Sequence, residues 1–167
     1  MGKTRHSGQA STPATLQLER AGIPFRIYEY THDADHMDSG YGVEAATRLG
    51  FDEGQVFKTL MADTGGERVI GIVPVNGHLN LKALAAAVGA KKATMADPSV
   101  AQRESGYVVG GISPFGQHTH HRTVLDEGAL TYDMILVSGG KRGFDVAVSP
   151  HDLLTVLHAA TAPIRKS

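Results

Sequence analysis

The sequence predicts one α+β domain, with a mixed, largely antiparallel sheet that curls towards a barrel and is surrounded by short helices. Short helical patterns interrupt about seven strand-like runs along the chain. Several of these runs are joined by turns too short for the crossover connection that parallel neighbours need. No repeat, low-complexity tract or Pro/Gly-rich linker divides the 167 residues. We therefore expect a disordered tail over residues 1–11 and a single domain over residues 12–167.

The helices are predicted from their capping residues and from the glycines that end them. A Ser, Thr, Asn or Asp side chain accepts hydrogen bonds from the first N–H groups of a helix, and proline suits the first helical position. Such caps predict helices that begin at Thr12-Pro13, Asn80, Asp97-Pro98 and Ser149-Pro150. A fifth helix is expected around Val43, Ala46 and Leu49, and Gly50 closes it.

The strands are predicted from runs of branched and aromatic residues bounded by turn residues. The clearest signal is a hairpin in which residues 56–62 and 68–75 flank Asp63-Thr64-Gly65-Gly66-Glu67. A strand over residues 25–30 comes earlier and is followed by a polar loop over residues 31–42, long enough to be functional. The remaining strands are expected over residues 107–109, 123–125, 134–137 and 144–148.

The composition limits the kinds of site that the chain can contain. There is no cysteine, which excludes disulfides, thiolate zinc sites and a cysteine nucleophile. The first residues lack the apolar run of a signal peptide and no run approaches transmembrane length, so we expect a soluble cytoplasmic protein. The net charge of −1 leaves only local contacts for a nucleic acid. Lys91-Lys92 and Lys141-Arg142 are candidates for such contacts, although solvated surface is the simpler explanation of either pair.

Lys58 is the first residue that suggests a site. Within Val56-Phe57-Lys58-Thr59-Leu60, the alternation of a strand places Lys58 on the same face as Val56 and Leu60. A lysine on an apolar face lies at a sheet edge, lays its stem over apolar surface, or points into a pocket. The strand pattern alone favours the first two of these positions over the pocket.

Two glycine loops that follow apolar runs form a second candidate site. One contains Gly110-Gly111-Ile112-Ser113-Pro114, and the other contains Ser138-Gly139-Gly140-Lys141-Arg142. Glycine lets backbone N–H groups approach a ligand closely, so either loop could bind a carboxylate, a phosphate or a developing oxyanion. Neither loop has the spacing of a Walker A or dinucleotide-binding loop. Taken alone, each is explained as well by an ordinary turn.

The run His118-Thr119-His120-His121 places three imidazoles within four residues. On a strand, His118 and His120 would point the same way, and such a pair can bind a transition metal. No carboxylate within the run completes a ligand set, and exposed loops also carry histidines at this spacing. We expect no metal and no other cofactor, and the sequence leaves open whether these histidines bind one.

In this order and at these separations, the motifs resemble the YbaK/EbsC family of stand-alone Cys-tRNA(Pro) deacylases, relatives of the editing domain of prolyl-tRNA synthetases. The resemblance covers about residues 12–165. Besides the Lys58 string and both glycine loops, it rests on Thr12-Pro13-Ala14, Leu81-Lys82-Ala83-Leu84, Gly89-Ala90-Lys91-Lys92, Met95-Ala96-Asp97-Pro98 and Thr123-Val124-Leu125-Asp126. It implies an α+β fold with a curved central sheet, and hydrolysis of the ester that joins a mischarged amino acid to tRNA(Pro).

The resemblance also implies roles for single residues. Lys58 matches the family's key lysine and would orient the substrate, while Gly110, Gly111 and Ser138 complete the expected catalytic set. The N–H groups of the glycine loops would hold the carbonyl oxygen or the backbone of the amino acid. Attack would come from the thiol of the cysteinyl substrate itself. The expected substrate-binding residues are Tyr30, Phe57, Ile112, Ser113, Pro114, Gly139, Gly140 and Asp145.

One stretch, His118–Arg122, departs from the family, whose members typically carry a basic run followed by Leu-Pro at this point. Histidines are mostly neutral at pH 7, so part of the expected tRNA-binding charge is missing. There are two alternatives to a Cys-tRNA(Pro) deacylase. One is a non-catalytic module that binds tRNA or a synthetase, and the other is an Ala-tRNA(Pro) deacylase. Because the net charge is small, selection of tRNA(Pro) is expected to be shared with prolyl-tRNA synthetase.

Overall fold

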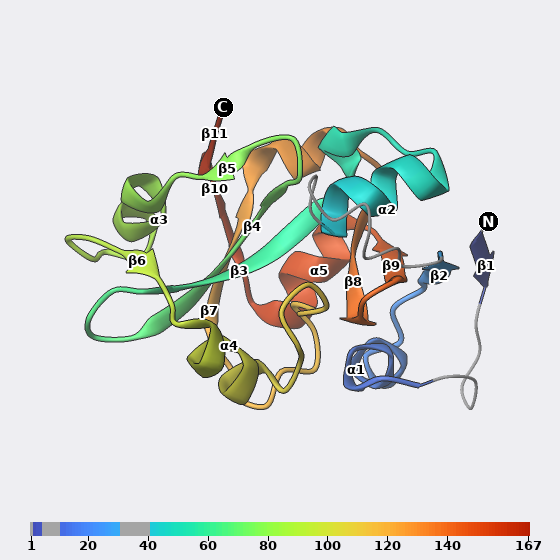
Figure 1. Ribbon diagram of the computed structural model, residues 1–167, viewed down its shortest axis with the longest axis horizontal. Helices are drawn as coiled ribbons and strands as arrows, with labels where there is room; N and C mark the ends of the chain where they lie inside the picture. Colours follow the sequence, from blue (N-terminus) through green and yellow to red (C-terminus); the bar gives the residue numbers. More distant parts are fainter. Residues whose placement is uncertain (1, 5–10, 31–40) are drawn as a thin grey trace.

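The computed structural model describes residues 2–4, 11–30 and 41–167, and these form a mixed α+β fold (Figure 1). The strands are β1 (Gly2–Thr4), β2 (Arg26–Glu29), β3 (Phe57–Asp63), β4 (Arg68–Pro74), β5 (His78–Leu79), β6 (Thr94–Met95), β7 (Arg122–Asp126), β8 (Ile135–Lys141), β9 (Phe144–Val148), β10 (Ala160–Ala162) and β11 (Arg165–Lys166). The helices are α1 (Pro13–Arg20), α2 (Tyr41–Leu49), α3 (Leu81–Ala87), α4 (Pro98–Ser105) and α5 (Pro150–Leu157), with short 3-10 helices η2 (Glu53–Gln55) and η3 (Glu127–Thr131). In the described part of the chain, no helix is long and apolar enough to cross a membrane.

The described strands form three sheets. The largest has the order β10-β7-β4-β3-β6, in which β7 is parallel to both of its neighbours and the other pairs are antiparallel. The sheet β1-β2-β9-β8 is antiparallel throughout, and β11 pairs with β5 in the same sense. The prediction of a mixed, largely antiparallel fold is confirmed. The described strands form separate sheets in place of the predicted single barrel-like sheet. Near β3 and β8, the described residues form one isolated bridge, between Val56, which precedes β3, and Leu136 of β8.

The predicted capping residues begin the helices. Thr12 and Thr15 form a reciprocal capping box at the start of α1. Asn80, Asp97 and Ser149 each accept a hydrogen bond from a backbone N–H group in the first turn of the following helix. Cap chemistry acts within a few residues, which is why the sequence predicts these helices well.

Three local predictions differ from the structure. Residues 107–109 form a bend and a turn instead of a strand, because Gly106 adopts a left-handed conformation and the N–H group of Gly111 donates to the carbonyl of Val108. Gly2–Thr4, within the predicted tail, pairs with β2 as the edge strand β1. Tyr41 and Gly42, the last two residues of the predicted loop, begin α2, and residues 31–40 lie outside the described residues.

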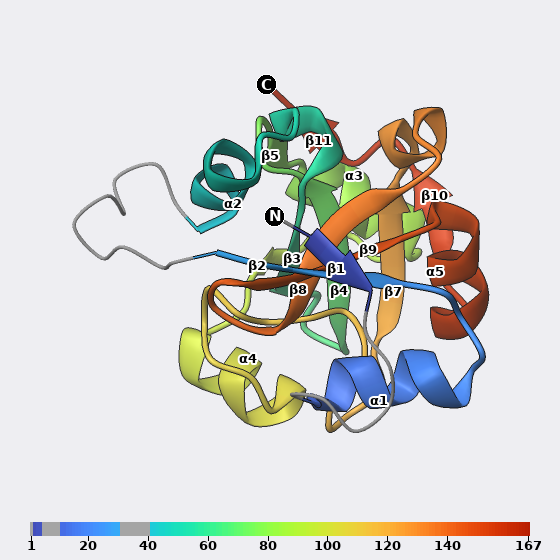
Figure 2. The same ribbon diagram turned by 90° about the vertical axis from the view of Figure 1, so that its right-hand side faces the viewer.

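The two larger sheets share one core. Side chains of β3 and β4, including Phe57 and Ile72, pack in one cluster with Val137 of β8 and Val146 of β9. Figures 1 and 2 show α1 and α4 together at one end of the molecule, with α2 and the β5–β11 pair at the other. Among the described strands, β6 pairs with β3 only at its last two residues, so the first part of β3 has an open edge on the side away from β4.

Candidate active site

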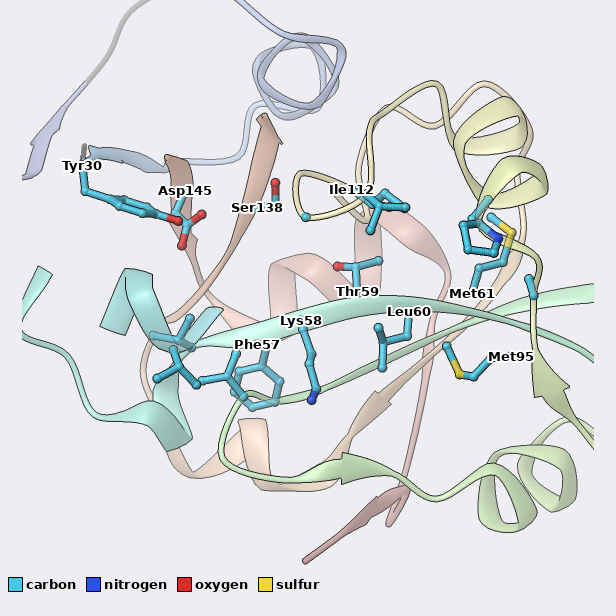
Figure 3. Close-up of a pocket in the computed structure, with 18 residues that line it drawn as sticks. Tyr30, Phe57, Lys58, Thr59, Leu60, Met61, Met95, Ile112, Ser138 and Asp145 are labelled. Carbon is cyan, nitrogen blue, oxygen red and sulfur yellow. The ribbon is translucent and has the colours of Figure 1, made fainter. Parts of the chain in front are cut away.

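A cavity of about 350 Å³ lies along this open edge, bordered by β3, α4, the loop that follows α4 and the β8–β9 hairpin (Figure 3). It brings together seven residues that the sequence predicted for the site, Tyr30, Phe57, Lys58, Gly110, Ile112, Ser138 and Asp145. The lining residues that were not predicted for the site are Val43, Val56, Thr59, Leu60, Met61, Val75, Met95, Ala96, Pro98, Ala101 and Val109. A mostly apolar cavity with a few convergent polar groups is typical of a small-molecule site.

The β8–β9 hairpin places Ser138 and Asp145 side by side. These two residues are directly opposite in the ladder, so their side chains share a face. The next pair is Lys141 with Phe144, which leaves Gly139 and Gly140 as a bulge. Gly140 has φ +116°, a conformation that suits glycine, and a Cβ there would lie 2.9 Å from the ring of Tyr107. The glycines therefore allow the irregular backbone that follows Ser138.

The five remaining residues of the predicted site, Gly111, Ser113, Pro114, Gly139 and Gly140, do not line the cavity. Ser113 is fully buried, and its Oγ accepts a hydrogen bond from the N–H group of Phe115 at 3.2 Å.

The two glycine loops pack directly against each other. A Cβ on Gly111 would lie 2.9 Å from backbone atoms of Lys141 and Arg142. The Arg142 guanidinium donates to the carbonyl of Val109 from Nε at 3.0 Å and from Nη2 at 2.7 Å. Thr12 at the start of α1 donates from its Oγ1 to the Gly139 carbonyl at 2.6 Å. Both loops are thus held from several sides.

Two N–H groups that the sequence suggested for substrate already have partners. The Gly111 N–H group donates to the Val108 carbonyl at 2.9 Å, and the Gly140 N–H group donates to Ser138 Oγ at 3.1 Å. The turn and the bulge therefore use two of the N–H donors that we expected to face the substrate.

Asp145 and Tyr30 form a buried polar corner of the cavity. The phenol end of Tyr30 points towards Asp145 (Figure 3). Burial raises the pKa of the Asp145 carboxyl to about 7. The pKa of Tyr30 is also raised, first by burial and then by the nearby Asp145 charge. Near neutral pH the Asp145 carboxyl can therefore donate as well as accept a hydrogen bond.

Lys58 is half-buried, and burial lowers the pKa of its ammonium group. No residue in the described part of the chain forms an ion pair with it. Figure 3 shows Lys58 and Thr59 leaving β3 on opposite sides, as strand alternation requires. The cavity lies at a strand edge, and so it borders residues of both faces. Lys58 thus offers a positive charge to an anionic group that enters along this edge.

Thr59 carries a hydroxyl group that has no partner in the described structure. The residue is 8% exposed, and its hydroxyl oxygen is buried without a hydrogen bond. Along β3, the backbone N–H and C=O groups of successive residues face β4 and the opposite side in turn. The Val56 carbonyl faces the β4 side and accepts from Val75, whereas the Met61 carbonyl faces the opposite side and accepts from Ala96. Thr59 lies two residues before Met61, so its N–H and C=O groups also face away from β4, towards the open edge. The sequence placed Thr59 next to Lys58 but gave no sign that this edge is open.

Comparison with known proteins assigns the family. Residues 40–156 match the aminoacyl-tRNA editing domain family. A protein of Enterococcus faecalis, EbsC, proposed to be a Cys-tRNA(Pro)/Cys-tRNA(Cys) deacylase, is 35% identical over an alignment of 159 residues that covers 93% of this chain and 94% of EbsC. This chain belongs to the aminoacyl-tRNA editing domain family. The resemblance to the YbaK/EbsC family is therefore confirmed.

Solved structures share the fold of this editing domain. The crystal structure of the hypothetical protein APE2540 has a TM-score of 0.82 at 22% identity, and the match covers 93% of this chain and 100% of that one. A second structure, described as a proposed trans-editing enzyme for prolyl-tRNA synthetase, has a TM-score of 0.78 at 24% identity, covering 95% and 100%. At these identities the two likenesses concern the fold alone.

The four basic residues predicted to bind tRNA lie in two separate places. Lys91, Lys92 and Lys141 are exposed, and Lys141 Nζ lies 5.0 Å from the centre of the Phe144 ring. Figure 1 shows the segment between α3 and β6, which carries Lys91 and Lys92, across β3 and β4 from the β8–β9 hairpin. Arg142 is exposed but holds the Val109 carbonyl, so part of its role is structural.

The three histidines of the editing domain separate in the structure. His118 and His120 are exposed, whereas His121 is buried and lies within hydrogen-bond distance of Glu104 and Gln117. Within the described ranges, no three His, Cys, Asp or Glu side chains converge as a metal site would require. The histidine run is thus divided between the surface and a buried contact.

Proposed function

We propose that this chain is a trans-editing aminoacyl-tRNA deacylase that removes the amino acid from mischarged tRNA(Pro), chiefly Cys-tRNA(Pro). The editing-domain family gives the reaction class, and the proposed activity of EbsC supports the substrate. The observation that carries the proposal is the set of polar groups at the open edge of β3. Lys58 lacks an ion pair and the Thr59 hydroxyl lacks a hydrogen bond within the described structure, and both line the cavity.

An aminoacyl ester is already activated, so binding and orientation can supply much of the catalysis. The cysteinyl thiol attacks its own carbonyl carbon, and the bond from that carbon to the ribose oxygen breaks. The thiol proton passes to the ribose oxygen, which leaves a thiolactone and tRNA with a free hydroxyl. A reaction of this kind needs no nucleophile or cofactor from the protein.

Residues on each side of the cavity are assigned a role in this reaction. Lys58 binds an anionic or ester oxygen near the terminal nucleotide. Because the Gly111 and Gly140 N–H groups are occupied, we assign the carbonyl oxygen to the N–H group and the hydroxyl of Thr59. Ser138 and Asp145 orient the amino group of the substrate, and apolar residues such as Ile112 enclose its side chain.

Replacing Thr59 with valine tests its role in substrate binding. The hydroxyl is buried without a partner, so its removal should leave stability unchanged or raise it by about 1 kcal/mol. A lost contact to the substrate should lower kcat/KM about tenfold. Urea unfolding would measure the unchanged or raised stability, and deacylation assays would measure the lowered kcat/KM. A Thr59→Val protein with full activity would show that the hydroxyl does not touch the substrate.

The proposed function is tested by a panel of mischarged tRNAs. Cys-tRNA(Pro) should lose its amino acid fastest, and mass spectrometry should detect the thiolactone. Faster release from Ala-tRNA(Pro) would indicate an alanine-specific enzyme, and binding without release would indicate a non-catalytic module. The same panel, run with and without prolyl-tRNA synthetase, tests whether the two proteins act together. If they do, a preference for tRNA(Pro) is expected only when the synthetase is present.

A further inference from the structure

His121 links α4 to the first glycine loop. Its side chain is 5% exposed, and its Nε2 lies 2.8 Å from Glu104 Oε1. Its Nδ1 lies 3.1 Å from Gln117 Oε1, and Gln117 Nε2 in turn donates to the Ser113 carbonyl at 2.9 Å. A continuous series of polar contacts therefore runs from the last turn of α4 to the residue that follows Ile112 in the cavity wall.

The two neighbours of the ring determine its charge. Hydrogen bonds from Arg68 and then from His121 lower the pKa of Glu104 to about 2. Glu104 is therefore a carboxylate at neutral pH, which can only accept, and Nε2 must carry a hydrogen. The Ser113 carbonyl also only accepts, so the amide nitrogen of Gln117 faces it and the amide oxygen faces Nδ1. Nδ1 must then carry a hydrogen as well, and a ring with both nitrogens protonated is an imidazolium.

The charged groups around the ring come from three elements. Glu104 on α4 favours the imidazolium, whereas Arg68 on β4, which donates to the same carboxylate, opposes it. Arg68 is itself 3.8 Å from Asp63 at the end of β3, which takes up part of its charge. His120 precedes the ring in the chain and is exposed. Glu104 is thus the anion nearest to the ring, in direct contact with it.

We propose that His121, as an imidazolium, is a positioning residue that fixes the Gly110–Pro114 wall of the substrate cavity through Gln117. The contact needs a hydrogen on both ring nitrogens. In a ring with only one hydrogen, Nε2 keeps it for the Glu104 carboxylate, so Nδ1 presents a lone pair to Gln117 Oε1. The amide can then satisfy His121 only by turning over, which releases the Ser113 carbonyl.

The wall matters because Gly110 and Ile112 line the cavity on either side of Gly111. Displacement of a positioning group by about 1 Å can slow a reaction about a hundredfold. Loss of one of the several contacts that hold this loop should therefore lower kcat about tenfold. The effect on activity rests on the proposed deacylase function, whereas the charge of the ring and its link to Ser113 do not.

Nitrogen-15 NMR of the histidine rings tests the charge without an activity assay. The His121 signals should show a hydrogen on both ring nitrogens. Replacement of Gln117 should shift these signals together with the backbone signals of residues 110–114. A ring with a hydrogen on only one nitrogen, or loop signals that stay unchanged when Gln117 is replaced, would overturn the proposal.

Two replacements of Gln117 separate its two contacts. Gln117→Glu keeps an acceptor for the His121 ring but cannot donate to the Ser113 carbonyl, and Gln117→Met removes both contacts. Each should lower kcat about tenfold with little change in KM, and Gln117→Glu should retain the imidazolium signals. His120→Gln, an exposed neighbour, should behave as the unmodified protein.

A kcat that is lowered about tenfold at unchanged KM in both Gln117 variants, while His120→Gln matches the unmodified protein, supports the proposal. Equal kcat values in all four proteins would contradict it. If no tRNA is deacylated but the NMR results hold, the proposed function fails and the link between His121 and the loop stands.

Discussion

Replacing Lys58 with alanine is expected to lower kcat/KM for the deacylation of Cys-tRNA(Pro) about a hundredfold. A hydrogen bond to a charged partner contributes about 1.5–3 kcal/mol, and each 1.4 kcal/mol corresponds to a factor of about ten. Lys58 is half-buried at the cavity and has no ion pair within the described structure, so its interaction with a substrate anion is only partly screened by water. Among the described residues that line the cavity, there is no other lysine.

The fold should tolerate this replacement. The ammonium group pays a desolvation penalty that no described partner offsets, so Lys58→Ala should change the unfolding free energy little. Lys82→Ala, which removes an exposed lysine from α3, is the matched control and should keep full activity. A folded Lys58→Ala protein with normal kcat/KM would remove Lys58 from the site. A change confined to KM would indicate binding of the tRNA rather than orientation of the ester.

The pH dependence gives a second test of Lys58. Burial lowers the pKa of the ammonium, so its charge is present at low pH and is lost, as the pH rises, before that of an exposed lysine. Substrate binding should therefore weaken on the alkaline side. Lys58→Arg keeps its charge throughout this range, so in that variant the alkaline decline in binding should be absent, even if the geometry of the guanidinium lowers the overall rate.

The accuracy of the sequence-based predictions follows the range of the interactions involved. Thr12, Asn80 and Asp97 predicted helix starts correctly because each cap bonds to N–H groups within three residues. The prediction of a strand over residues 107–109 was wrong. The apolar run resembles a strand, but the left-handed backbone of Gly106 and the hydrogen bond from the Gly111 N–H group to the Val108 carbonyl turn the chain there. The short strands β5, β6, β10 and β11 have too few residues to show alternation.

The site was harder to predict because its parts meet through distant contacts. Alternation placed Lys58 on an apolar face but could not show that it borders a cavity, since that depends on β6 pairing with only two residues of β3. The same open edge exposes Thr59, which the predicted site did not include. The glycine loops were recognised as a pair, but their packing against each other brings together residues about thirty positions apart in the chain.

Replacing Gly111 with alanine is expected to damage both stability and activity. The new Cβ would lie 2.9 Å from backbone atoms of Lys141 and Arg142, and backbone atoms cannot rotate away as a side chain can. The two glycine loops must therefore move apart, which should lower the unfolding free energy by about 1–3 kcal/mol. The shift carries Gly110 and Ile112 with it and strains the contact from Arg142 to Val109, so kcat should fall about a hundredfold.

Gly66→Ala is the matched control for this replacement. Gly66 is exposed in the β3–β4 turn, has no atom within 4 Å of an added Cβ and no positive φ, so alanine should be tolerated there. Thermal unfolding and deacylation assays on both variants separate the outcomes. If Gly111→Ala unfolds at a lower temperature and loses activity while Gly66→Ala does neither, the contact between the loops supports the site. A Gly111→Ala protein with normal stability and activity would mean that the loops can separate without disturbing the cavity, and that Lys58 and Thr59 on β3 bind the substrate without help from this wall.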